Sequence, residues 1–133
     1  MSSKPSRLKF SFPRFSFYAA LLPRRNPETV KTVLENLPLQ GFAELWGEEI
    51  YFSVDFDIPQ ERGATIVAAG DIGFWPPGPA IAIFFGKTPA SRGEKPEAAS
   101  AVNVFACVEN LKEFLGHLKD VQPDTLIRVS KVK

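Results

Sequence analysis

The stretch from Gly70 to Phe85, GDIGFWPPGPAIAIFF, decides the fold of this chain. Two apolar segments, 71–75 and 80–85, flank Pro76-Pro77-Gly78, residues that favour a rigid tight turn. In such a turn the Trp75–Pro76 bond is a candidate for the cis form. The second segment does not alternate polar with apolar residues, which is typical of a strand buried on both faces. We therefore predict a hairpin of two neighbouring strands in a β-rich protein.

The composition supports a β-rich fold. The 133 residues include twelve Phe and twelve Pro, and 44% of them are hydrophobic. Phe suits half-buried strand surfaces, whereas Pro ends short strands and is not tolerated within a central one. The length is that of a single domain. We expect a flexible N-terminus over residues 1–7, followed by one barrel or sandwich domain over residues 8–133.

Hydrophobic alternation with a period of two predicts the other strands. The clearest example runs from Glu49 to Ile58, where apolar residues alternate with a polar face that carries Glu49, Tyr51 and Asp55. One side of this strand should face a core and the other should face water. The predicted strands are 8–12, 15–21, 49–58, 64–69, 71–75, 80–85, 102–108 and 126–132.

Two segments show a helical period instead. Apolar residues three and four positions apart predict short helices at about residues 27–36 and 110–118. Asn26 and Asn110 stand where N-cap residues are expected. The loop 86–100 is rich in Gly, Pro, Ser and charged residues, and we expect it to be the most mobile segment.

Charge and residue counts argue against several protein classes. Sixteen Lys and Arg against fifteen Asp and Glu leave a net charge of +1, so no overall basic field attracts nucleic acid. One Cys and one His cannot supply a disulfide framework or the usual zinc site, and we predict neither a metal nor another cofactor. No apolar run approaches the ~20 residues of a membrane span. We expect a cytoplasmic protein that does not bind membranes.

The N-terminal segment Arg7–Phe15 interleaves cations with aromatic residues, as single-stranded nucleic-acid platforms do. In two alternating strands, however, Phe10, Phe12, Phe15 and Phe17 would all point inward. No aromatic surface would then remain for bases to stack on. We therefore interpret this segment as structural.

Neither the single His nor the single Cys is predicted to be catalytic. His117 lies on the flank of the second predicted helix, and no nucleophile or orienting partner can be assigned to it by spacing. We interpret it as a surface residue. Cys107 lies within a strand without an adjacent cation, which favours a small buried hydrophobe over a reactive thiol.

Three motifs resemble a family of small prokaryotic cyclophilin-like proteins of unknown function. They are Trp46–Phe52 (WGEEIYF), Gly70–Gly78 (GDIGFWPPG) and Ile83–Pro89 (IFFGKTP), and Ser100–Val104 is similar to the family's next strand. The chain departs from the family at Phe74, where Tyr is more common. The resemblance spans about residues 15–132. It implies a closed, mainly β barrel of about eight strands with two short helices.

The resemblance does not imply prolyl isomerase activity. True cyclophilins carry a catalytic Arg in an F-H-R-type motif, which this chain lacks. Our first hypothesis is a noncatalytic module that binds a small molecule or peptide in a groove near Trp46, Tyr51, Trp75, Phe84 and Phe85. The alternative is an enzyme, either a divergent prolyl isomerase or a subunit of a larger hydrolase or oxoprolinase-type complex, which would require a partner subunit.

The predicted ligand site lies at the Trp75 end of the hairpin, where an indole beside a rigid proline turn offers a large apolar face. Trp46 would supply a second wall, and Glu49 and Tyr51 the polar contacts. Structural interpretations remain open, because a proline turn needs no ligand and a polar strand face is commonly just solvated. The predicted binding residues are Trp46, Glu49, Tyr51, Trp75, Pro76 and Pro77.

Overall fold

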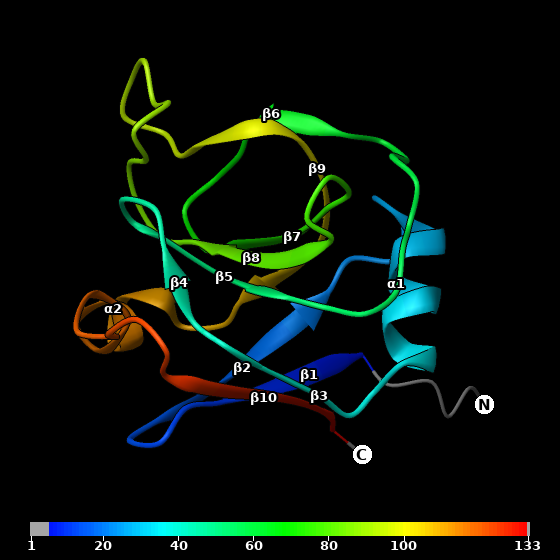
Figure 1. The fold of residues 1–133 in the computed structure, drawn as a ribbon, viewed down its shortest axis with the longest axis horizontal. Coiled ribbons are helices and arrows are strands. Elements are labelled where there is room, and N and C mark those ends of the chain that lie inside the picture. The colour runs from blue at the N-terminus through cyan, green and yellow to red at the C-terminus, as the bar shows by residue number, and fades with distance from the viewer. Residues whose placement is uncertain (1–5, 133) are drawn as a thin grey trace.

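The computed structural model describes residues 6–132, which form ten strands and two helices (Figure 1). The expected flexible N-terminus falls largely outside the described residues, and Arg7 already belongs to the first strand. The elements are β1 (Arg7–Ser11), β2 (Ser16–Leu21), α1 (Pro27–Glu35), β3 (Leu39–Phe42), β4 (Glu44–Leu45), β5 (Glu49–Ser53), β6 (Ala64–Ile66), β7 (Asp71–Trp75), β8 (Ala80–Phe84), β9 (Glu97–Val108), α2 (Leu111–Lys119) and β10 (Leu126–Lys131).

The strands form one antiparallel sheet in the order β3-β10-β1-β2-β9-β7-β8-β5-β4, with β6 paired to β9. The prediction of a mainly β fold is confirmed, but this sheet is not closed into a barrel by hydrogen bonds. Its two edge strands, β3 and β4, are instead consecutive in the chain and separated only by the buried Ala43. Both strands are short and partly or fully exposed, so they carry no apolar alternation that would have predicted them.

The hairpin predicted from the central stretch is confirmed. β7 and β8 pair antiparallel with Trp75 opposite Ala80, and the turn between them has a hydrogen bond from Gly78 N to Trp75 O. The Trp75–Pro76 bond is not cis; the cis peptide bonds of the described residues precede Pro38 and Pro79.

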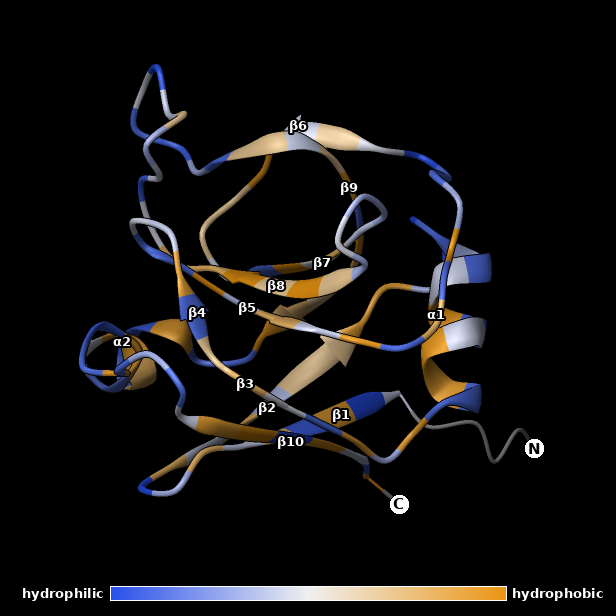
Figure 2. Ribbon diagram, in the orientation of Figure 1, coloured by the Kyte–Doolittle hydropathy of each residue, from blue (hydrophilic) through white to orange (hydrophobic). Residues whose placement is uncertain are grey.

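β8 is buried along its whole length, which explains why its sequence does not alternate. Ile81 and Ile83 belong to the main hydrophobic core, whereas Ala82 and Phe84 belong to a smaller second core. β6 and the first half of β9 cover this second core (Figure 1), and β8 is accordingly apolar in Figure 2. The central part of the sheet therefore has a packed layer on each face.

Two strand boundaries differ from the prediction. β5 ends at Ser53 rather than at residue 58, because Ser53 pairs with Ala80, the first residue of β8, and the neighbouring strand then runs out. β9 begins at Glu97, so the last residues of the expected loop 86–100 are strand. Because β9 starts this early, its first half packs over the second core.

Both helices form where predicted, but their first turns are stabilised differently. The Asn26 side chain does not cap α1; it donates to Val104 O at 2.7 Å. The Glu61 carboxylate instead accepts hydrogen bonds from the backbone N–H groups of Glu28 and Thr29. Asn110, before α2, adopts a left-handed conformation with φ of 57° and also makes no side-chain cap. None of the helices in the described part of the chain is long and apolar enough to cross a membrane.

Candidate functional site

A cavity of about 230 Å³ lies within the second core. Its floor consists of side chains from β5, β7 and β8, and the opposite wall comes from the first half of β9. The lining residues are Trp46, Glu49, Tyr51, Trp75, Ala80, Ala82, Phe84, Ala98, Ala99 and Val102.

Strand register brings these side chains to one face. In the pairing of β5 with β8, Glu49 lies opposite Phe84 and Tyr51 lies opposite Ala82. Because side chains alternate between faces, residues two apart on each strand point into the same space. Trp75 continues this face on β7, opposite Ala80. Strand alternation and pairing thus bring residues of the three separate motifs to the same cavity.

Four of the lining residues are alanines: Ala80, Ala82, Ala98 and Ala99. In a packed interior, small side chains among large ones leave space unless a neighbour fills it. The aromatic side chains that line the cavity do not fill the space left by these alanines, so it remains open as the cavity. The alternating Ala residues of β8 were a sequence signal for this space, whereas Ala98 and Ala99 stood in an expected loop and carried none.

A tight turn positions Trp46 at the cavity. Trp46 N donates to Glu49 O at 3.0 Å, which closes a hairpin turn over Gly47 and Glu48. Gly47 has a φ of +61°, and a Cβ there would lie 2.9 Å from Thr88 Cα, so both its conformation and its surroundings require glycine. This accounts for the Trp-Gly pair of the first motif.

Trp75 is held by its ring nitrogen. Its indole N–H donates to Ser100 Oγ at 2.7 Å, which joins the end of β7 to the covering part of β9. The ring is half-buried and packs against the second core. A hydrogen-bonded and partly packed indole presents a fixed apolar face at little entropic cost.

Glu49 is the unusual residue of this site. Its side chain is only 8% exposed, and its Oε1 has no hydrogen-bond partner among the described residues. Burial raises the pKa of its carboxyl to about 7. An unpaired buried oxygen costs on the order of 1–3 kcal/mol, and more when it is charged. The interpretation of Glu49 as part of a solvated strand face is therefore wrong.

Tyr51, two residues further along β5, is half-buried beside Glu49. Burial raises the pKa of its phenol, and the carboxylates of Glu44 and Glu49 raise it further. The phenol is therefore neutral at physiological pH and can donate a hydrogen bond. Asp55, predicted to share this face, lies beyond the end of β5 and is exposed.

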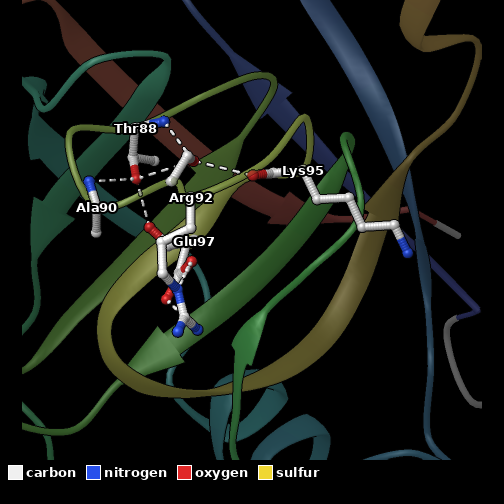
Figure 3. Close-up of polar contacts among 6 residues, drawn as sticks. Thr88, Ala90, Arg92, Lys95 and Glu97 are labelled. Carbon is white, nitrogen blue, oxygen red and sulfur yellow. Dashed lines mark hydrogen bonds and ion pairs between the residues drawn. The ribbon is translucent and has the colours of Figure 1, made fainter.

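The loop before β9 is organised around Thr88 (Figure 3). The Thr88 hydroxyl donates to the carbonyl of Glu97, and Thr88 N donates to Ser91 Oγ at 2.9 Å. Ser91 Oγ in turn donates to Lys95 O, and Arg92 pairs with the Glu97 carboxylate at 3.1 Å. These bonds connect the loop to the first residue of β9, just before the two alanines of the cavity wall.

Four of the six predicted binding residues line this cavity: Trp46, Glu49, Tyr51 and Trp75. Pro76 and Pro77 do not line it; they belong to the turn that follows Trp75. Phe84 lines the cavity, but Phe85, which follows the last residue of β8, belongs to the main core. The six-residue proposal thus reduces to four residues, with Phe84 and the alanines added.

The single His and Cys both lie outside this cavity. His117 is exposed, as predicted, and its ring stacks on Phe15 at 5.0 Å between centroids. Cys107 is partly rather than fully buried, and burial raises the pKa of its thiol. Of the four Phe side chains predicted to point inward, Phe10, Phe12 and Phe17 are buried, whereas Phe15 is only partly buried.

Comparisons with known proteins establish the family. The chain belongs to the cyclophilin-like family, whose model matches residues 6–129, and this confirms the predicted family resemblance. It is similar to the hypothetical protein AF2241 from Archaeoglobus fulgidus, with 33% identity, a TM-score of 0.78 and coverage of 99% of this chain and 100% of that one.

A more distant structural neighbour is McbB, solved in complex with tryptophan. The likeness has 16% identity and a TM-score of 0.68, and it covers 92% of this chain and 44% of McbB. At this identity the likeness concerns the fold alone. No curated protein matched the chain.

Proposed function

We propose that this protein is a binding module that takes a small organic molecule into the cavity between Trp46 and Trp75. The observation that carries the proposal is the buried carboxylate of Glu49, which forms no ion pair with a described residue, in an otherwise aromatic and apolar lining. A cavity that combines apolar walls with one or two fixed polar groups is the usual form of a small-molecule site.

The volume limits the ligand. A cavity of 150 Å³ accepts benzene in another protein, so about 230 Å³ suits one ring with a short substituent. A longer molecule or a peptide would have to insert only one end or one side chain. The size therefore favours a small metabolite-like compound over a bound peptide segment.

Intrinsic fluorescence tests this proposal directly. Trp46 and Trp75 are the only two tryptophans of the chain, and both line the cavity. A ligand that enters should change the tryptophan emission and raise the melting temperature in a compound screen.

An alanine-to-leucine pair provides the matched control. Ala99 is exposed at the rim of the cavity, so Ala99→Leu should obstruct ligand entry without overpacking the core. Ala69 is also exposed but does not line the cavity. The proposal requires that Ala99→Leu weakens every hit and that Ala69→Leu does not. Hits that are insensitive to Ala99→Leu would place the binding elsewhere and refute it.

The enzymatic alternative makes a different prediction. Prolyl isomerisation needs a cation held against the imide, but none of the lining residues is basic. The two arginines of the central part of the chain are engaged elsewhere: Arg62 donates to Arg24 O and Arg92 pairs with Glu97. We expect a peptide isomerase assay to show no turnover above the uncatalysed rate. Clear turnover that is lost in Arg62→Ala or Arg92→Ala would favour the enzyme.

A further inference from the structure

We infer that the ligand of this cavity carries a protonated primary or secondary amine, which binds against Glu49 between the aromatic rings. The inference rests on the proposed function and specifies the ligand class for the same site. It follows from three properties of the lining: its charge, its unmet hydrogen bond and its π faces.

The first property is charge. Glu49 is the only lining residue with a formally charged side chain at neutral pH, and no Lys, Arg or His lines the cavity. No described basic group forms an ion pair with Glu49. A carboxylate that has left water without a counter-charge is compensated best by a cation supplied from outside. The net charge of the whole chain is only +1, so selectivity for a cation would come from this residue and not from a general field.

The second property is the missing hydrogen bond. Oε1 of Glu49 is inaccessible to solvent and has no donor within reach in the described part of the chain. A ligand in the cavity would therefore reach this carboxylate through its other oxygen, Oε2, which is not among the shielded atoms. A quaternary ammonium ion has no N–H to offer and would leave the carboxylate without a hydrogen bond. A primary or secondary ammonium donates a charge-assisted hydrogen bond to the carboxylate. The ligand is therefore expected to carry at least one N–H on its cationic nitrogen.

The third property is aromatic. Trp46, Tyr51 and Trp75 contribute three rings to a small lining, and the negative faces of such rings attract cations. Phe84 and the alanines add an apolar surface for the body of the ligand. Rings and carboxylate thus favour the same sign of charge, and an anionic ligand would be opposed by both.

A series of benzyl compounds separates these contributions. Benzylamine, benzyl alcohol, benzyltrimethylammonium and benzoate share one ring and differ in charge and in hydrogen-bond donors. Binding is followed by tryptophan emission and by calorimetry at pH 8. This pH ionises Glu49, whose pKa is about 7, while alkylamines remain protonated.

We expect benzylamine to bind the wild-type protein at least about tenfold more tightly than benzyl alcohol or benzyltrimethylammonium, and benzoate to bind most weakly. Glu49→Gln should remove the advantage of benzylamine while benzyl alcohol binds as before, which also shows that the cavity is intact. Glu35→Gln, an exposed carboxylate on α1, should change neither compound. The inference is overturned if benzoate equals benzylamine, if the quaternary ion binds more tightly, or if Glu49→Gln leaves the selectivity unchanged.

A second arm identifies the source of the amine. Nα-acetyl-lysine methylamide presents the same ammonium group as a peptide side chain would. Tighter binding of benzylamine supports a free small amine, as inferred, whereas exclusive binding of the lysine derivative assigns the cavity to a lysine side chain and overturns the free-amine source.

Failure of the inference is distinguishable from failure of the proposed function. Binding of benzyl alcohol that Ala99→Leu blocks, without any preference for the amine, refutes the ligand class and leaves the binding module standing. If the whole benzyl series fails to bind, the inference is refuted and the proposed function depends on the wider screen. A wider screen without any cavity-dependent ligand refutes both.

Discussion

Glu49 should make the protein less stable as the pH rises, in contrast to the usual behaviour of a paired carboxylate. Its pKa is about 7 in the folded state because of burial, against an ordinary value of 4.5. The folded state therefore holds this proton more strongly than the unfolded state does. Between these two values the unfolding free energy falls with pH, and above pH 7 the full penalty is present.

The magnitude follows from the size of the shift. A pKa raised from 4.5 to about 7, at about 1.4 kcal/mol per pH unit, corresponds to about 3.5 kcal/mol in full, of which about 3 kcal/mol is lost between pH 4.5 and pH 8. Glu49→Gln has no proton to lose and removes this pH dependence. The variant should therefore gain about 3 kcal/mol relative to the wild type on going from pH 4.5 to pH 8. The amide of the new Gln side chain would also lack a partner. This changes the difference in unfolding free energy between the variant and the wild type by the same amount at every pH, so the slope of that difference against pH is unaffected.

Urea unfolding at half-unit steps from pH 4.5 to 8, followed by circular dichroism, measures this difference. Glu35→Gln serves as the control, because Glu35 is exposed and should give a flat difference curve. The cause is loss of solvation and not repulsion between charges, so 1 M salt should leave the slope nearly unchanged. A flat curve for Glu49→Gln, or a slope that salt abolishes, would refute the reasoning.

Three further changes test the surroundings of the site. Ser100→Ala removes the acceptor of the Trp75 indole N–H, and we expect a loss of up to about 1 kcal/mol in stability with weaker ligand binding, measured by urea unfolding and fluorescence titration. Asn103→Leu breaks a fully buried amide that accepts from Glu61 N and donates to Thr29 Oγ1, and should cost about 2–4 kcal/mol; a loss below 1 kcal/mol would contradict this. Glu61→Ala leaves the first turn of α1 without its carboxylate and should cost about 1 kcal/mol without changing ligand affinity.

Four residues of the candidate site could be predicted from the sequence, because motifs and strand alternation depend only on neighbouring residues. Trp46 before a glycine turn and Trp75 before a proline turn lie in the motifs that resemble the family, and strand alternation places Glu49 with Tyr51 on one strand face. All four residues line the cavity. Pro76 and Pro77, the other two predicted residues, do not line the cavity although they follow Trp75 directly. A tight turn instead carries the chain away from the lined face.

The burial of Glu49 could not be read locally. A carboxylate that alternates with apolar residues looks like a solvated one, since the pattern shows which face a side chain is on but not what covers that face. Here the cover is the first half of β9, about fifty residues further along the chain, in a stretch with the composition of a loop. The capping of α1 could not be predicted locally for the same reason, since its first turn is stabilised by the distant Glu61 and not by the adjacent Asn26.

The sequence by itself determined the positions of both helices and of most strands, because periodicity and turn residues act over a few neighbours. It determined the central hairpin β7–β8 and the two-sided burial of β8 for the same reason. Only the tertiary structure decided that the edge strands β3 and β4 meet at Ala43, that β9 covers the second core, and that Glu49 lies in a cavity without a partner. These features depend on contacts between distant segments, and the free energy of such contacts is set by packing and desolvation, which no local pattern records.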